Sequence, residues 1–137
     1  MCTDDHRLAT MPPEQNQAAA TDIIPDADVI GRFATARVVC LGDIMLDRYV
    51  YGRVDRISPE APIPVIAVER EAAMLGGVGN VARNVAALGG AASLLATIGD
   101  DDAGREVVRL LADETRIDAD LITDIGRATT VKTRFVA

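Results

Sequence analysis

A cluster of glycines that leads directly into an amphipathic helical pattern is the feature that most constrains this chain. Gly76, Gly77 and Gly79 lie among apolar residues at helical spacing, which are Val78, Val81, Ala82, Val85 and Ala86. Because glycine has no Cβ, a ligand can approach the free backbone N–H groups at the start of such a helix closely. The pattern predicts a ligand-binding turn and a helix that ends at Gly89-Gly90.

Strand-like and helix-like segments alternate along the chain. Strands are predicted at 37–42, 49–52, 63–68, 93–98, 119–123 and 129–136, and a second helix at 103–112, capped by Asp101 or Asp102. Three prolines restrict the strand at 63–68 to an edge or a lid, because proline has no N–H to donate to a neighbouring strand. The alternation predicts an α/β fold with a parallel sheet and right-handed crossovers.

The N-terminal segment differs in composition from the rest. Residues 1–28 are rich in Ala, Pro, Gln, Asp and Thr, and bury too little apolar surface to offset the entropy of ordering, so disorder is predicted there. A short lead-in helix is predicted at 29–33. We therefore expect an extension over 1–36 and one domain over 37–137.

Composition excludes several classes of function. The net charge of −7 argues against nucleic-acid or anionic-membrane partners. No apolar run reaches the ~18 residues of a spanning helix, and no signal peptide is visible at the N-terminus. Cys2 and Cys40 make a poor disulfide candidate, and a reduced, cytoplasmic protein is expected.

Candidate metal and nucleophile chemistry is sparse. His6 is the only histidine and lies in the N-terminal segment, which removes a Ser-His-Asp triad and a His-based zinc site. The acidic run at 100–102 is predicted to cap the helix that follows it and to favour the positive end of that helix. No metal site is predicted.

The glycine motif resembles that of ribokinase-type (PfkB) carbohydrate kinases. Gly76, Gly77, Asn80, Ala82, Gly89 and Gly99 stand at the spacing typical of that family, whereas Val78 replaces its usual small residue. The resemblance implies that Asp47, Gly76, Gly77 and Asn80 bind the sugar. The chemistry agrees, because a carboxylate accepts two hydroxyl hydrogen bonds and an amide both donates and accepts. A solvated loop position remains the alternative for Asp47.

A longer run narrows the resemblance. Residues 42–49 (GDIMLDRY) and 56–65 (RISPEAPIPV) are similar to the kinase domain of bacterial D-glycero-D-manno-heptose 7-phosphate kinases. The match covers about 37–137 and implies the N-terminal portion of a ribokinase-like parallel-sheet sandwich. It also implies a small β lid, with strands at about 47–68, that often pairs subunits into a homodimer. The implied activity is ATP-dependent phosphorylation of the sugar phosphate, on the path to ADP-heptose and lipopolysaccharide core.

A phosphorylated substrate needs cationic partners. Lys132 and Arg134 alternate on one face of the strand predicted at 129–136. One of these two, or Arg56, is predicted to meet the substrate phosphate through charge-assisted hydrogen bonds. A solvated strand face is the alternative reading of the same pattern.

The catalytic half of such a kinase is not recognisable in this sequence. In the resembled family the base is an Asp of a Gly-x-Gly-Asp motif, and that motif is absent here, so it is expected beyond Ala137 together with most of the ATP and Mg²⁺ site. The chain is expected to be a kinase fragment that is inactive alone and prone to aggregate. A non-catalytic sugar-binding or dimerisation module is a second interpretation.

A dinucleotide-binding domain is the third interpretation. Residues 77–82 fit the pattern G-x-G-x-x-A, and Asp100 follows near the distance of a ribose-binding acid. That fingerprint requires a strand immediately before its first glycine. Residues 69–75 are charged and are predicted not to form one, which disfavours this interpretation.

Overall fold

The computed structural model describes residues 26–137. It has three helices, α1 (Asp26–Phe33), α2 (Val78–Ala87) and α3 (Asp102–Ala112). Its six strands are β1 (Arg37–Leu41), β2 (Ile44–Ile57), β3 (Pro64–Gly77), β4 (Ala91–Gly99), β5 (Ile117–Asp124) and β6 (Thr130–Val136). The predicted lead-in helix corresponds to α1. The disorder predicted for 1–28 falls almost entirely outside the described residues.

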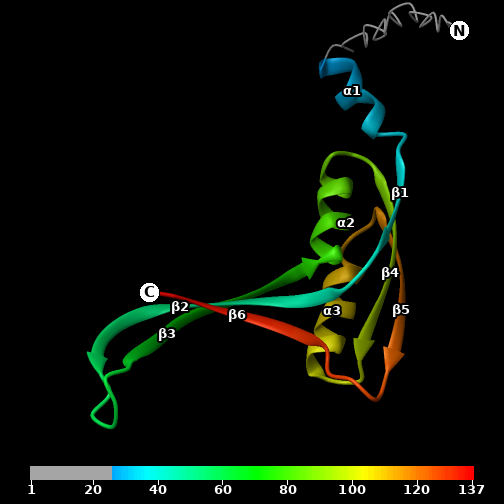
Figure 1. Cartoon of the computed structure of the whole chain (residues 1–137). Coiled ribbons are helices and arrows are strands. Elements are labelled where there is room, and N and C mark those ends of the chain that lie inside the picture. Colours follow the sequence, from blue (N-terminus) through cyan, green and yellow to red (C-terminus); the bar gives the residue numbers. More distant parts are fainter. Residues whose placement is uncertain (1–25) are drawn as a thin grey trace, which may run out of the picture.

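The body is a parallel sheet in the order β1-β4-β5. Helices α2 and α3 cover one face of it (Figure 1), and Cys40 of β1 lies beside Leu94 of β4 under this cover. The core is closed by Ile98, Val107 and Leu111, all buried. The predicted strand–helix alternation and parallel pairing are confirmed, as are the helix starting at Val78 and its end before the positive-φ Gly89.

The opposite face of the body sheet is bare. Val39 and Leu41 of β1 are 78% and 73% exposed, and Ile122 of β5 is 55% exposed. Parallel sheets in α/β proteins are ordinarily covered on both faces, which is why their strands read as continuous apolar runs. The sequence of β1 is thus apolar on both faces of the sheet, and the described residues cover only one of these faces.

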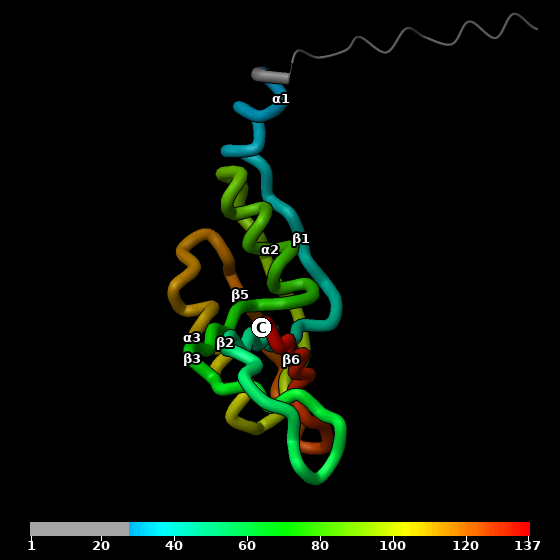
Figure 2. The backbone as a smooth tube through the Cα atoms, turned by 90° about the vertical axis from the view of Figure 1, so that its left-hand side faces the viewer, coloured from blue at the N-terminus to red at the C-terminus, as the bar shows by residue number. Residues whose placement is uncertain are grey.

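The second sheet is a lid in the order β3-β2-β6. Strands β2 and β3 form a long antiparallel hairpin, and β6 adds to β2 in parallel. The hairpin projects sideways from the body in Figure 1 and toward the viewer in Figure 2. Leu46 and Leu75, 0% and 2% exposed, join the base of the lid to the body core.

The lid is larger than its sequence predicts. Strands β2 and β3 have 14 residues each, whereas the prediction limited strand structure to 49–52 and 63–68 and the lid to about 47–68. The expectation that 69–75 is not a strand is wrong. Glu69, Arg70 and Glu71 are exposed because this part of the hairpin stands away from the body, where charged side chains remain in water. The edge position predicted for the proline-rich strand is confirmed, with Pro64 as its first residue.

A polar junction fixes where β6 begins. Asp101 caps α3 by accepting a hydrogen bond from the Gly104 N–H at 2.7 Å, and its second oxygen accepts from the Thr129 N–H at 2.8 Å. The buried Thr129 hydroxyl in turn accepts from the Gly99 N–H at 2.8 Å. The predicted helix cap is confirmed, and it also ties the end of β4 to the start of the third lid strand.

Within residues 26–137, no helix has the length and apolarity needed to cross a membrane.

Candidate functional site

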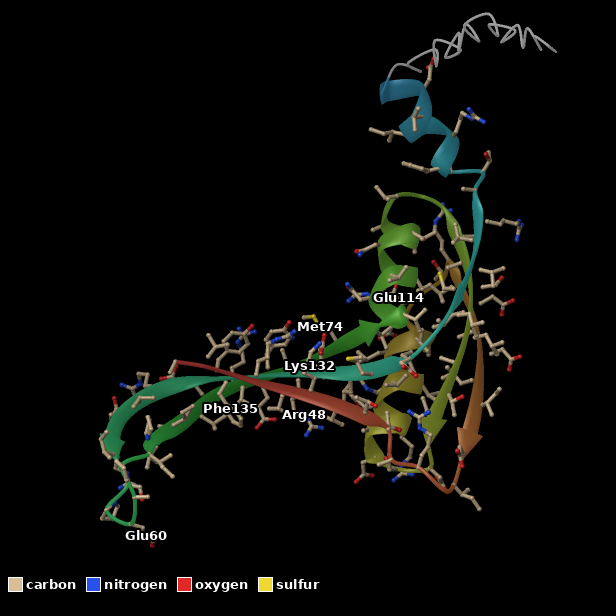
Figure 3. All side chains as sticks on the ribbon, viewed as in Figure 1. Arg48, Glu60, Met74, Glu114, Lys132 and Phe135 are labelled. Carbon is tan, nitrogen blue, oxygen red and sulfur yellow. The ribbon has the colours of Figure 1, made fainter. Side chains whose placement is uncertain are left out.

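Asp47 lies in β2, where the lid leaves the body. It is 9% exposed, and it stands in register with Met74 of β3 and Lys132 of β6. Residues directly opposite one another share a face of a sheet. Because side chains alternate along a strand, Leu46 and Arg48 face the other way. Figure 3 shows Met74 on one side of the lid ribbon and Arg48 and Phe135 on the other.

Among residues 26–137, Lys132 is the nearest charge to the Asp47 carboxylate. Its Nζ lies 2.8 Å from Oδ1 of Asp47 and 3.7 Å from Sδ of Met45. Oδ1 is buried and makes no hydrogen bond of good geometry among the described residues. The Lys132–Asp47 contact is thus an ion pair whose angles differ from those of a hydrogen bond. A carboxylate oxygen has more than one lone-pair site, so Oδ1 can still accept from a hydroxyl donor.

Arg134 provides a second cation, one residue pair further along the lid. Its Nη1 donates to the Tyr49 hydroxyl at 2.7 Å and lies 3.7 Å from Oδ2 of Asp47. The guanidinium also lies over the Tyr49 ring, 5.1 Å from its centroid. The structure thus brings the two predicted cations, Lys132 and Arg134, to the predicted sugar ligand.

The two glycines before α2 leave room at this point. A Cβ on Gly76 would lie 2.7 Å from Oδ2 of Asp47, so a side chain here would displace the carboxylate. Gly77 has φ +59°, and a Cβ there would collide with the carbonyl oxygen of Asp43. That carbonyl accepts from the Val78 N–H at 3.0 Å. The glycines form the floor beside Asp47 and the turn into α2.

Neither Asn80 nor Arg56 makes a hydrogen bond or an ion pair with Asp47 among the described residues. Asn80 is on the exposed side of the first turn of α2 and lines a cleft of about 400 Å³ with Arg83 and the connection from α3 to β5. In that cleft Arg83 Nε donates to Glu114 at 2.7 Å. Arg56 is in register with Val65 far out on the hairpin, nine residues from Asp47 and roughly 30 Å away along the strand. The structure does not bring Arg56 to Asp47.

Three residues of the site were not predicted from the sequence. Tyr49 and Tyr51 follow Asp47 at every second position of β2, and their rings stack with centroids 6.2 Å apart. Arg70 of β3 stands opposite Tyr51 and covers its ring at 4.0 Å. The alternation Asp47, Tyr49, Tyr51 is visible in the sequence. It could have identified the two tyrosines once Asp47 was placed on a strand.

The structure argues against a dinucleotide-binding domain, but for a different reason from the one that the sequence suggested. A strand, β3, does lead into Gly77, so the absence of a strand is not the reason to reject it. A dinucleotide fold requires that strand to lie in the same parallel sheet as the strand after the helix. Here β3 belongs to the antiparallel lid hairpin and β4 to the body sheet. The helix α2 connects two different sheets.

Metal-ligating side chains do not converge in the described part of the chain. Among residues 26–137, no three His, Cys, Asp or Glu side chains lie close enough together to hold an ion. Asp101, of the acidic run, is occupied by the Gly104 and Thr129 N–H groups. The residues that the structure describes therefore do not fit a Mg²⁺ site.

A parallel α/β body that carries a β lid, with a carboxylate and two cations at their junction, defines a sugar-kinase type of domain. The family described as pfkB family carbohydrate kinase matches residues 35–137, and the chain belongs to this family. Solved structures agree: the fold is similar to phosphofructokinase-2 from Escherichia coli in complex with fructose-6-phosphate. The TM-score is 0.56 with 26% identity, over 74% of this chain and 31% of that one.

The curated relatives are more specific. The chain is 64% identical over 105 residues to the bifunctional protein HldE of Caulobacter sp. (strain K31), covering 77% of this chain. It is 58% identical over 100 residues to the bifunctional protein HldE of Paramagnetospirillum magneticum, covering 73% of this chain. The chain spans about a fifth of the length of these relatives (22% and 20%).

Proposed function

We propose that this chain is the sugar-binding part of a kinase for D-glycero-D-manno-heptose 7-phosphate. The complete enzyme would transfer the γ-phosphoryl group of ATP to that sugar phosphate and give the 1,7-bisphosphate, for ADP-heptose and lipopolysaccharide core. The observation that carries the proposal is the buried Asp47 carboxylate with Lys132 at 2.8 Å and Arg134 at 3.7 Å. An acceptor for hydroxyls next to fixed cations suits a ligand that is both a polyol and an anion.

Each group has a role that its position allows. Asp47 accepts hydrogen bonds from sugar hydroxyls, and Gly76 keeps the space beside Oδ2 open for them. Lys132 and Arg134 supply the positive charge that a phosphorylated sugar requires. Gly77 and Asn80 are proposed as further sugar contacts, at the turn and first helical residues of α2. Because Arg56 lies far along the hairpin, Lys132 and Arg134 are the stronger candidates for the phosphate.

This part of the enzyme binds and orients; the reacting groups are supplied elsewhere. Phosphoryl transfer depends chiefly on alignment of the acceptor and on charge neutralisation. ATP and Mg²⁺ are implied by the family, and the base that deprotonates the acceptor hydroxyl is expected in the part of the enzyme beyond Ala137. We expect the 137 residues alone to bind the sugar phosphate without turning over ATP.

Binding by the chain itself tests the proposal. Calorimetric titration with D-glycero-D-manno-heptose 7-phosphate should give saturable binding, which Asp47→Asn weakens at least about tenfold, as expected when a charged hydrogen-bond acceptor is lost. Glu60→Gln, at the tip of the hairpin, is a control that also removes one carboxylate but should leave binding unchanged. Equal binding by the Asp47 and Glu60 variants would reject the site.

A second interpretation, a non-catalytic sugar-binding or dimerisation module, predicts the same binding. Sequencing the locus past the codon for Ala137 separates the two. A continuous reading frame that reaches a Gly-x-Gly-Asp motif supports the kinase. A stop codon with no such motif downstream leaves the binding module as the better account of this gene product.

The lid is also a proposed subunit contact. Phe135, Ile57 and Val68 are 65%, 61% and 54% exposed on lid strands, and exposed apolar side chains on a strand pair favour association. A homodimer through the lid of the complete protein would show twice the monomer mass by light scattering. A Phe135→Asp variant should shift that mass toward the monomer. If the Phe135→Asp variant has the same mass as the unaltered complete protein, the lid is not the subunit contact.

A further inference from the structure

The ligand face of the lid continues beyond Asp47 as a row of tyrosines and arginines. Tyr49 and Tyr51 stack with an interplanar angle of 16°, Arg134 lies over the first ring and Arg70 over the second. The four side chains come from all three lid strands and share one face, since Tyr49 is in register with Arg134 and Tyr51 with Arg70. We call these four residues the Arg–Tyr row.

This face concentrates positive charge on an acidic chain. Lys132, Arg134 and Arg70 give three positive charges against the single negative charge of Asp47, a sum of +2, whereas the whole chain carries −7. Like charges held together on one face repel each other unless an anion joins them. The concentration therefore points to an anionic ligand on this face.

The distance along β2 between Asp47 and Tyr49 indicates where the two ends of such a ligand would lie. Asp47 and Tyr49 are two residues apart on β2, so the Arg–Tyr row begins roughly 7 Å beyond the hydroxyl acceptor. That separation is comparable to a sugar ring with its exocyclic carbon. A phosphate on the end of the sugar remote from the Asp47 hydroxyls would thus lie beside the Arg–Tyr row, where the side chains of Arg134 and Arg70 extend over the rings.

The arginines keep donors available for it. A guanidinium that stacks by its face on an aromatic ring still presents its N–H groups at its edge. Within the described residues, Arg70 has no carboxylate within ion-pair distance. Arg134 uses Nη1 for the Tyr49 hydroxyl and for its 3.7 Å approach to Oδ2 of Asp47, and its other nitrogens make no hydrogen bond there. The two rings are neighbours, with centroids 6.2 Å apart, so the two guanidinium groups that lie over them follow one another along the same face of the lid.

We propose that the Arg–Tyr row is the subsite for the substrate's phosphate, with Arg70 and Arg134 as its donors and the two tyrosine rings as their support. Lys132 then stays with Asp47 as the counter-ion beside this buried carboxylate. This inference rests on the proposed function, and it divides the cations of that site into two roles. Arg70 and Tyr51 become specificity-determining residues for phosphorylated over unphosphorylated sugars.

Calorimetry with two matched sugars tests the assignment on the full chain. D-glycero-D-manno-heptose 7-phosphate and the same heptose without phosphate are titrated into the wild type, Arg70→Gln and Arg53→Gln. Arg53 is the control, because it is a lid arginine already paired with Glu69 at 2.5 Å. We expect Arg70→Gln to weaken binding of the sugar phosphate about tenfold, the cost of one charge-assisted contact. Binding of the free heptose should be unchanged, and Arg53→Gln should change neither.

Each outcome decides the point. Equal affinity of Arg70→Gln and Arg53→Gln for the sugar phosphate would overturn the subsite, even if Asp47→Asn abolishes binding and the proposed function stands. An equal loss for both sugars in Arg70→Gln would also overturn it, because Arg70 would then serve the lid rather than the phosphate. Tyr51→Leu, which removes the ring under Arg70, should reproduce the selective loss. If the wild type binds neither sugar, the proposed function fails, and the subsite with it.

Discussion

Lys132 Nζ lies 2.8 Å from Oδ1 of Asp47, across the parallel pair of β6 and β2. The two residues are far apart in the chain and meet because β6 joins the lid rather than the body sheet. Lys132 is also the only lysine among the 14 basic residues of the sequence. A compact ammonium on a flexible stem can occupy the space beside a buried carboxylate in a way that the planar guanidinium does not.

Removing this partner should destabilise the chain. Lys132→Met leaves the Asp47 carboxylate without its nearest cation, and we expect the free energy of unfolding to fall by about 1–2 kcal/mol, since the lysine itself is partly exposed. Urea unfolding at neutral pH measures it. Adding Asp47→Asn to Lys132→Met should recover part of the loss, because no charge then remains to be compensated. Two losses that simply add would contradict a direct coupling.

The turn into α2 should tolerate no side chain. Gly77→Ala places a Cβ against the Asp43 carbonyl at φ +59°, and we expect a loss of more than about 1 kcal/mol in the free energy of unfolding. Gly31→Ala is the matched control, because Gly31 lies in α1 and a Cβ added there would meet no atom within 4 Å. It should be neutral or slightly stabilising, as alanine is in a helix. Thermal melts that rank the two variants the other way would refute this account of the turn.

Acid should weaken the junction between α3 and β6. Hydrogen bonds from the Thr129 and Gly104 N–H groups lower the pKa of Asp101 below its ordinary value of 3.8. A carboxyl group whose pKa is lower in the folded state than in the unfolded state stabilises the fold at any pH above its unfolded-state pKa. This stabilisation is lost as the pH falls below 3.8 and passes through the folded-state pKa. Asp101→Asn should be less stable than wild type at pH 7 and should lose less stability on acidification.

The control for the pH experiment is Asp120→Asn. Asp120 is exposed on β5 and makes no side-chain hydrogen bond among the described residues. Urea midpoints for the three proteins, recorded from pH 7 down to about pH 3, provide the comparison. Parallel curves for wild type and Asp101→Asn would show that the junction does not depend on the Asp101 charge.

The sequence predicts those parts of this structure that depend on neighbouring residues, and not those that depend on contacts between distant segments. The helix after Gly77, the Asp101 cap and strands β4 and β5 follow from local rules, and all of them were predictable. The extent of the hairpin was not, because strands that stand away from a core lose the apolar alternation by which strands are recognised. The pairing of β6 with β2 was equally hidden, since no local pattern says which sheet a strand joins. Asp47, Lys132 and Arg134 could be named separately, but their contact depends on that pairing.

The bare face of the body sheet should make the 137-residue chain associate. Val39 and Leu41 are 78% and 73% exposed on one sheet face, and large exposed apolar side chains on a sheet promote self-association. Val39→Thr with Leu41→Thr places β-branched residues at both strand positions while adding hydroxyl groups. We expect lower binding of a hydrophobic dye and a smaller mass by light scattering than for the unaltered chain. Unchanged values in both measurements would locate the association elsewhere.

Binding of a phosphorylated sugar to the lid face around Asp47 can be measured at the single lysine of the chain. With isotope-labelled lysine, NMR detects one side-chain ammonium signal, that of Lys132, beside the carboxylate in question. Titration with D-glycero-D-manno-heptose 7-phosphate should shift this signal saturably, and Asp47→Asn should abolish the saturation. A Lys132 signal that does not move at millimolar sugar phosphate, in a folded chain, would contradict the account.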